Sequence, residues 1–181
     1  LAYTAVFGGG FSATLSLEDP IERRSGVLGS GPVLAPAIAN INDFRYSAVS
    51  APDIVAALRV DQSWGSAQLS GALHQVRSIA SAYPAGAGLT ASKWGWAVQG
   101  GLKLNLPMIA PGDQLWLQAA YANGATSYGG MTNLIAGATA TSSIGGVLPT
   151  TLADGFADAT GRLSLVKSWS IAGAFIHYWT P

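Results

Sequence analysis

The chain has 181 residues, only 10% of them charged, and its nine basic residues balance nine acidic ones. This composition excludes a basic nucleic-acid surface, and the absence of cysteine excludes disulfides and cysteine-based metal sites. Mean hydropathy is +0.32, yet glycine and polar residues break every apolar run before the ~20 residues that a membrane-spanning helix needs. Apolar residues spread over alternating strands are instead typical of a transmembrane β-barrel.

Alternation of apolar and polar residues predicts the strands in chain order. In FSATLSLE, residues 11–18, every second side chain is apolar, which is the pattern of a strand with one apolar and one polar face. Seven strands are predicted, at residues 1–7, 11–18, 53–62, 66–76, 93–106, 114–121 and within 163–179. The facing of the last strand stays open, because both of its sides are apolar. The loop before it has room for a further short strand.

The connections between these strands alternate between short and long. Short turns follow the first, third and fifth strands, beginning with a triple-glycine turn at residues 8–10. Long segments at about 19–52, 78–92 and 122–162 follow the other strands. Bacterial barrels have short periplasmic turns and long external loops. The sequence therefore predicts that residues 1–181 are part of a single β-barrel domain whose long loops are external.

Charged side chains fall mostly on the polar side of the predicted strands. They are Glu18, Arg59, Asp61, Lys93 and Lys103, with Arg77 as an exception at a strand end. A soluble sandwich would show the same alternation, but this polar side carries few charges for a soluble surface. Aromatic residues also gather near strand ends, where the interfacial girdles of barrels lie. The apolar side is therefore predicted to face lipid and the polar side to face water inside a tube.

Four blocks of the chain resemble a known family. They are YTAVFGGGFSATLSLEDP, PDIVAALRVDQSWGSAQLSGALHQV, GWAVQGGLKLNLPMIAPGDQLWLQAAYANGATSY and HYWTP. Together they are similar to the alphaproteobacterial porins, which are general-diffusion porins of the outer membrane. The resemblance implies a sixteen-stranded antiparallel barrel, three barrels per functional unit, and passage of small hydrophilic solutes. It also implies that this chain is the middle portion of a longer protein and supplies about seven or eight strands. The leader, earlier strands, constricting loop and terminal aromatic strand of the family are not seen.

On this facing, one set of side chains is predicted to line the pore: Glu18, Arg59, Asp61, His74, Gln99, Lys103, Asn105 and Gln118. Fixed charges on a water-filled wall bias which ions enter. Arg59 and Lys103 lie near mid-strand and are expected to form a basic strip. The alternative that Arg59 merely pairs with Asp61, two residues away on the same face, is left open.

Other polar residues are weaker candidates for a site. His74 is interpreted as polar filling of the wall rather than a metal ligand or a pH-sensitive group. Ser70 shares its face, but four residues along a strand span about 13 Å, too far for a serine–histidine pairing. The charged run at residues 22–24 could line the pore mouth, contact lipopolysaccharide or be solvated. No catalytic residue, metal or cofactor is expected.

The predicted function is a passive outer-membrane channel for ions and small hydrophilic solutes. The expected partners are outer-membrane lipid, lipopolysaccharide and two further copies of the chain, and no nucleic acid. The alternative is a soluble all-β carbohydrate-binding module that uses Trp94 and Trp96, which share one face. That face continues through Val98, Leu102 and Leu104, which is too apolar to leave in water. A barrel enzyme or adhesin has no supporting group of residues.

Overall fold

The computed structural model describes residues 1–30, 44–80, 90–130, 153–158 and 162–179. Within these residues the chain is built from β-strands and short 3-10 helices, with no α-helix. None of the described helices has the length and apolar character needed to cross a bilayer. The prediction of a nearly all-β, antiparallel fold is confirmed.

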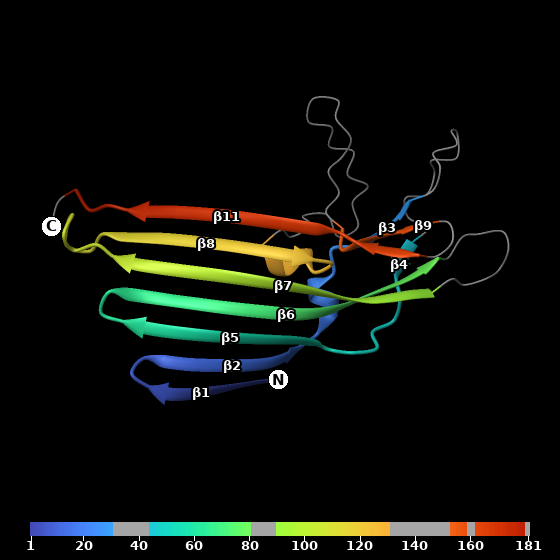
Figure 1. Ribbon diagram of the computed structural model, residues 1–181, viewed down its shortest axis with the longest axis horizontal. Coiled ribbons are helices and arrows are strands. Elements are labelled where there is room, and N and C mark those ends of the chain that lie inside the picture. The colour runs from blue at the N-terminus through green and yellow to red at the C-terminus, as the bar shows by residue number, and fades with distance from the viewer. Residues whose placement is uncertain (31–43, 81–89, 131–152, 159–161, 180–181) are drawn as a thin grey trace, which may run out of the picture.

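Seven strands form one antiparallel sheet in the order β1-β2-β5-β6-β7-β8-β11, and the short β4 pairs with β6 beside this path (Figure 1). The seven are β1 (Ala2–Gly8), β2 (Phe11–Glu18), β5 (Asp53–Gln62), β6 (Gly65–Ala80), β7 (Thr90–Asn105), β8 (Gln114–Asn123) and β11 (Lys167–Ile176). β2 and β5 have the predicted bounds. β6 and β7 extend toward each other past their predicted ends, so the segment between them is shorter than 78–92.

The short turns all lie at one end of the sheet. Figure 1 shows the β1–β2, β5–β6 and β7–β8 connections together at this end, with the long connections at the other. Gly8, Gly9 and Gly10 have φ angles of 84°, 58° and 79°, a left-handed conformation that glycine adopts without steric cost. The triple-glycine segment is therefore a tight turn, as predicted.

The strand register aligns the apolar residues of all seven strands on one face. One row across the sheet joins Ala13, Leu58, Leu69, Gly100, Ala119 and Ile171. This face is uncovered in the described structure, since Leu58 is 60% exposed and Ile171 is 74% exposed. The register also fixes the facing of the last strand, because Ile171 and Phe175 pair with Ala119 and Leu115 of the apolar face.

The opposite, polar face is covered at its long-loop end by a group of short elements, here called the cap. The cap consists of η1 (Pro20–Arg23), β3 (Val27–Ser30), β4 (Phe44–Tyr46), η3 (Thr126–Gly129), β9 (Gly155–Asp158) and β10 (Leu163–Leu165). β10, β9 and β3 form a small sheet in which β3 is parallel to β9. Val27 and Leu163 of this sheet pack against Val76 of β6, and all three are buried. β9 is the short extra strand that the sequence left room for in the loop at 122–162, and β10 lies in the segment predicted to hold the last strand.

The chain after β8 passes very close to β7. A Cβ atom on Gly95 of β7 would lie 2.3 Å from the carbonyl oxygen of Gly124, well inside contact distance. Only glycine lets the backbone that leads into η3 lie directly on the strand. This close approach holds η3 against the polar face, where Ala125 packs with Ala97 and Ala122.

Candidate functional site

The polar face of the seven-stranded sheet, here called the polar wall, carries the candidate site. Its residues alternate with those of the apolar face, and the register brings Arg59, Gln68, Gly101, Gln118 and Ala172 into one row across five strands. The eight residues predicted to line a pore all belong to this face. The structure distributes them over three regions of it, namely a central groove, the turn end and the long-loop end under the cap.

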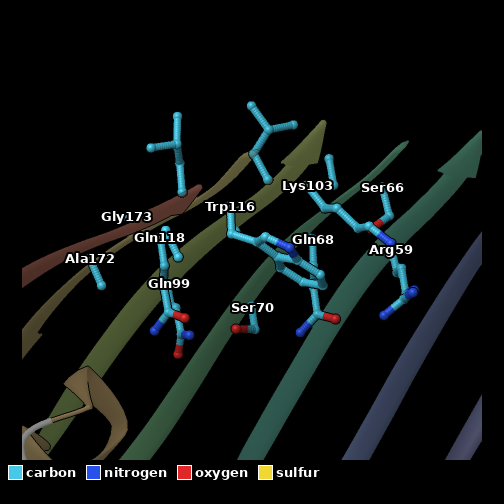
Figure 2. Close-up of a pocket in the computed structure, with 15 residues that line it drawn as sticks. Arg59, Ser66, Gln68, Ser70, Gln99, Lys103, Trp116, Gln118, Ala172 and Gly173 are labelled. Carbon is cyan, nitrogen blue, oxygen red and sulfur yellow. The ribbon is translucent and has the colours of Figure 1, made fainter. Parts of the chain in front are cut away.

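A groove of about 320 Å³ lies in the middle of the polar wall (Figure 2). Four of the predicted residues line it, Arg59, Gln99, Lys103 and Gln118. Asp61 and Asn105 line an adjoining hollow at the turn end. The floor of the groove is low at Gly101, where an added Cβ would meet no atom within 4 Å.

Arg59 and Asp61 form a close ion pair on this wall. Arg59 donates from Nε and from a terminal nitrogen to the two carboxylate oxygens, each at 2.7 Å. Both side chains are about half exposed, at 51% and 52%, so solvent screens the pair and its contribution to stability is small. The pairing that the sequence left open is therefore present, and it largely cancels the charge of Arg59 close to the wall.

Lys103 is not a member of this ion pair. Its ammonium lies 5.1 Å from the centre of the Trp116 ring, a cation–π arrangement. Lys103 forms no salt bridge among the described residues. Of the two residues expected to form a basic strip, Arg59 is ion-paired and Lys103 has no ion-pair partner among the described residues.

At the long-loop end, the wall is sealed by the cap. His74 is fully buried and its Nδ1 lies 2.7 Å from a carboxylate oxygen of Asp53, which is also fully buried. The His74 Nε2 lies 3.1 Å from the Tyr46 hydroxyl, which itself donates to Asp154 at 2.6 Å. Each ring nitrogen of His74 therefore has a hydrogen-bonding partner, Asp53 at Nδ1 and the Tyr46 hydroxyl at Nε2. His74 was predicted on an open wall, and the structure instead places it under the cap.

Asp154 is the centre of this buried network. One oxygen accepts the Thr126 backbone N–H at 2.9 Å and its hydroxyl at 2.8 Å, and the other accepts the Ser25 N–H at 2.8 Å as well as the Tyr46 hydroxyl. Burial and the Asp154 carboxylate raise the pKa of Tyr46 well above its ordinary value. This single carboxylate thus joins three elements of the cap that are far apart in the sequence.

A second tyrosine ties the cap to the wall. Tyr128 of η3 donates to Asp53 at 2.9 Å and lies 3.4 Å from Glu18. Glu18 also accepts from the Ser16 hydroxyl at 3.1 Å and pairs with Arg23 at 3.5 Å. Burial and the hydrogen bond to Asp53 raise the pKa of Tyr128. Glu18, predicted to line the pore, therefore lies at the edge of the cap.

The structure also bears on the serine–histidine pairing that the sequence analysis weighed. Among the described residues no hydrogen bond joins Ser70 to His74, whose partners are Asp53 and Tyr46. Asp53 and His74 are fully buried, and the Tyr46 hydroxyl donates to Asp154. The described residues contain no cluster of histidine and carboxylates suited to a metal ion.

The sequence did not identify several residues that shape the wall. Trp116 lines the central groove from the polar face of β8, between Gln114 and Gln118. An apolar residue at a polar position of the alternation was the signal that could have found it. Asp154 and Tyr46 lie in segments without periodicity, where the sequence carries no comparable signal.

A family comparison agrees with this architecture. A family model described as "Porin subfamily" matches residues 1–179. The chain therefore belongs to the porin subfamily, a family of bacterial outer-membrane proteins, and the sequence resemblance is confirmed. No curated protein and no solved structure gives a comparable match.

Proposed function

We propose that this protein forms a water-filled channel through the bacterial outer membrane for passive diffusion of ions and small hydrophilic solutes. The observation that carries the proposal is the contrast between the two faces of one sheet. Leu58, Leu69 and Ile171 are 60%, 55% and 74% exposed on one face. The other face bears Arg59, Lys103 and the glutamines of an open groove. Hydrocarbon outside and water inside is the arrangement that satisfies both faces.

The proposal includes closure of the sheet. Backbone groups at a sheet edge are not tolerated in lipid, so the edges of β1 and β11 need partners. In a sixteen-stranded barrel, strands beyond those described here supply them. Three such barrels per functional unit, with lipopolysaccharide around their outer ends, complete the proposed assembly.

Neighbouring residues of β7 provide the test. Leu102 lies on the apolar face and Lys103 on the polar wall. Leu102→Arg should impair membrane insertion, since an arginine on the lipid face costs ~2–4 kcal/mol near the midplane. Lys103→Glu should insert normally, give stepwise conductance in a planar bilayer and shift ion preference toward cations. If Lys103→Glu blocked insertion while Leu102→Arg did not, the facing of the sheet would be inverted.

The alternative of a soluble carbohydrate-binding module has weaker support. Trp94 and Trp96 are 49% and 41% exposed, but they lie on the apolar face together with Val98. Extraction separates the two functions, because a channel needs detergent to leave the membrane fraction and a soluble module does not.

A further inference from the structure

We propose that the central groove of the polar wall is a weak binding subsite for a neutral sugar ring, with Trp116 as its stacking platform. This inference rests on the proposed channel function and names a solute class for it. The residues that carry it are Trp116, Lys103 and three glutamines, Gln68, Gln99 and Gln118. None of the tryptophans of the apolar face takes part.

Trp116 is an aromatic side chain on the polar wall, in a groove lined largely by polar and small residues. It is 44% exposed, and Figure 2 shows its indole in the middle of the groove, with the glutamines around it. Lys103 lies over one side of the ring, and much of the residue stays open to the groove. An apolar ring surface with polar groups at its margin matches a pyranose, which presents C–H groups on its faces and hydroxyls at its rim.

The polar groups around the indole are free to bind a ligand. Among the described residues, no hydrogen bond, ion pair or ring contact engages the side chains of Gln68, Gln99 or Gln118. A primary amide both donates and accepts, as a sugar hydroxyl does. Other polar side chains of the wall already have partners. Asp61 accepts from Arg59, and Asn105 donates to the Ser63 carbonyl.

The size of the groove fits a monosaccharide. Arg59 is ion-paired with Asp61 and Lys103 lies over the Trp116 ring, so the site carries one net positive charge, and the Lys103 ammonium can donate a hydrogen bond to a sugar hydroxyl. The volume of about 320 Å³ is near the lower limit of small-molecule sites, roughly 300–1,000 Å³. Gly101 keeps the floor open between Gln68 and Gln118, its neighbours in the row.

One platform and a few hydrogen bonds give weak binding, on the order of a millimolar Kd. Weak binding suits a channel, because a solute must be attracted enough to enter and must still leave. The site therefore raises the local concentration of ring sugars without trapping them.

The test compares a locked sugar ring with an open chain of similar size. Methyl β-D-glucopyranoside and sorbitol are added to the intact protein in a planar bilayer, and conductance is followed with concentration. The glucoside should reduce conductance with saturation and sorbitol should not. Trp116→Ala should raise the half-saturating concentration about tenfold, equivalent to ~1.4 kcal/mol. Trp116→Phe should keep most of the effect, and Gly101→Leu should remove it by filling the floor.

Trp96→Ala is the matched control, because it removes a tryptophan of similar exposure from the apolar face. It should leave the glucoside effect unchanged. Equal responses to glucoside and sorbitol in the unaltered protein, or no change in Trp116→Ala, would overturn the inference. Tighter binding of benzoate than of the glucoside would also overturn it, since the groove would then be an aromatic-anion site.

Saturation-transfer NMR on the detergent-solubilised protein separates this inference from the channel itself. Ring protons of the glucoside should receive saturation from the unaltered protein and lose it in Trp116→Ala. Normal conductance steps without any transfer would contradict the sugar site and leave the channel standing. Transfer without conductance would support the site and contradict the channel.

Discussion

The central groove and the capped region lie on the same face of the same sheet, yet they treat polar groups in opposite ways. In the groove, Gln99 and Gln118 have no protein partner among the described residues and stay in contact with solvent. Under the cap, Asp53, His74 and Asp154 are fully buried and each has partners at hydrogen-bond distance. Alternation along a strand determines which side chains lie on the polar face of the sheet. Whether they then meet water or protein depends on segments outside the sheet.

The comparison is most strongly tested at Asp154. Asp154→Ala leaves the Ser25 and Thr126 N–H groups and the Tyr46 hydroxyl without their acceptor in a buried site. Loss of one member of such a network costs ~3–5 kcal/mol. We expect the cap to detach from the wall, which would appear as faster hydrogen exchange at Ser25 and Thr126 while the β5–β8 amides stay protected.

Asp61→Ala is the control for this change, because it removes a carboxylate from the open part of the same face. Asp61 is 52% exposed and its pairing with Arg59 is screened by solvent, so the loss of stability should be much smaller than in Asp154→Ala. A comparable loss of stability in both variants would show that the two regions do not differ in the way described.

A smaller effect on ion preference is expected at Arg59. Asp61→Asn removes the negative partner that lies 2.7 Å from Arg59 and leaves the guanidinium charge uncompensated. In a salt gradient, the reversal potential of this variant should move toward anions. Arg59→Gln combined with Asp61→Asn should return it close to the original value, since the pair as a whole is neutral. An unchanged reversal potential in the single variant would mean that Arg59 does not face the conducting water.

The smallest expected effect concerns a buried carboxylate at the turn end. Asp113 accepts from His177 Nδ1 at 2.7 Å and from the Tyr178 backbone N–H at 3.0 Å. Burial acts to raise the pKa of Asp113, but these hydrogen bonds and the His177 charge outweigh it and hold the pKa below its usual value. Ionised Asp113 therefore stabilises the fold above the ordinary carboxyl pKa of about 3.9, and this contribution is lost as pH falls through the lowered value.

Asp113→Asn should remove that part of the acid sensitivity. The detergent-solubilised variant should have a lower Tm than the unaltered protein near neutral pH. The two Tm values should converge in acid, as the Asp113 carboxylate of the unaltered protein becomes protonated. A constant difference in Tm across this range would contradict a role for the ionised carboxylate.

Much of the sheet could be predicted because the alternation of apolar and polar residues along a strand indicates which face of the sheet each side chain lies on. The bounds of β2 and β5 and the side on which Arg59 and Lys103 project follow from period-two alternation alone. The network around Asp154 could not be predicted, because its bond to Ser25 joins residues 129 positions apart through segments with no periodicity. His74 shows the limit within a strand, since alternation placed it on the polar face but could not show that the cap covers it.

Trp116 was missed for a related reason. The alternation of β8 was followed through Leu115 and Leu117, and the large apolar residue between them was not assigned to a site. Its meaning comes from the neighbours that the register supplies, Lys103 across the β7–β8 pair and Gln68 one row away on β6. Cross-strand neighbours of this kind become visible only when the pairing is known.

The close passage of Gly124 over Gly95 has a practical consequence for engineering. A single methyl group at residue 95 would collide with the backbone that enters η3, so Gly95→Ala would act as a wedge beneath one anchor point of the cap. Foreign peptides displayed on this scaffold would have to avoid both this crossing and the η3 residues that follow it, since Thr126 and Tyr128 bind the buried carboxylates. An insertion just before Gly124 would separate the chain that enters η3 from β7 and displace the η3 residues that contact the polar wall.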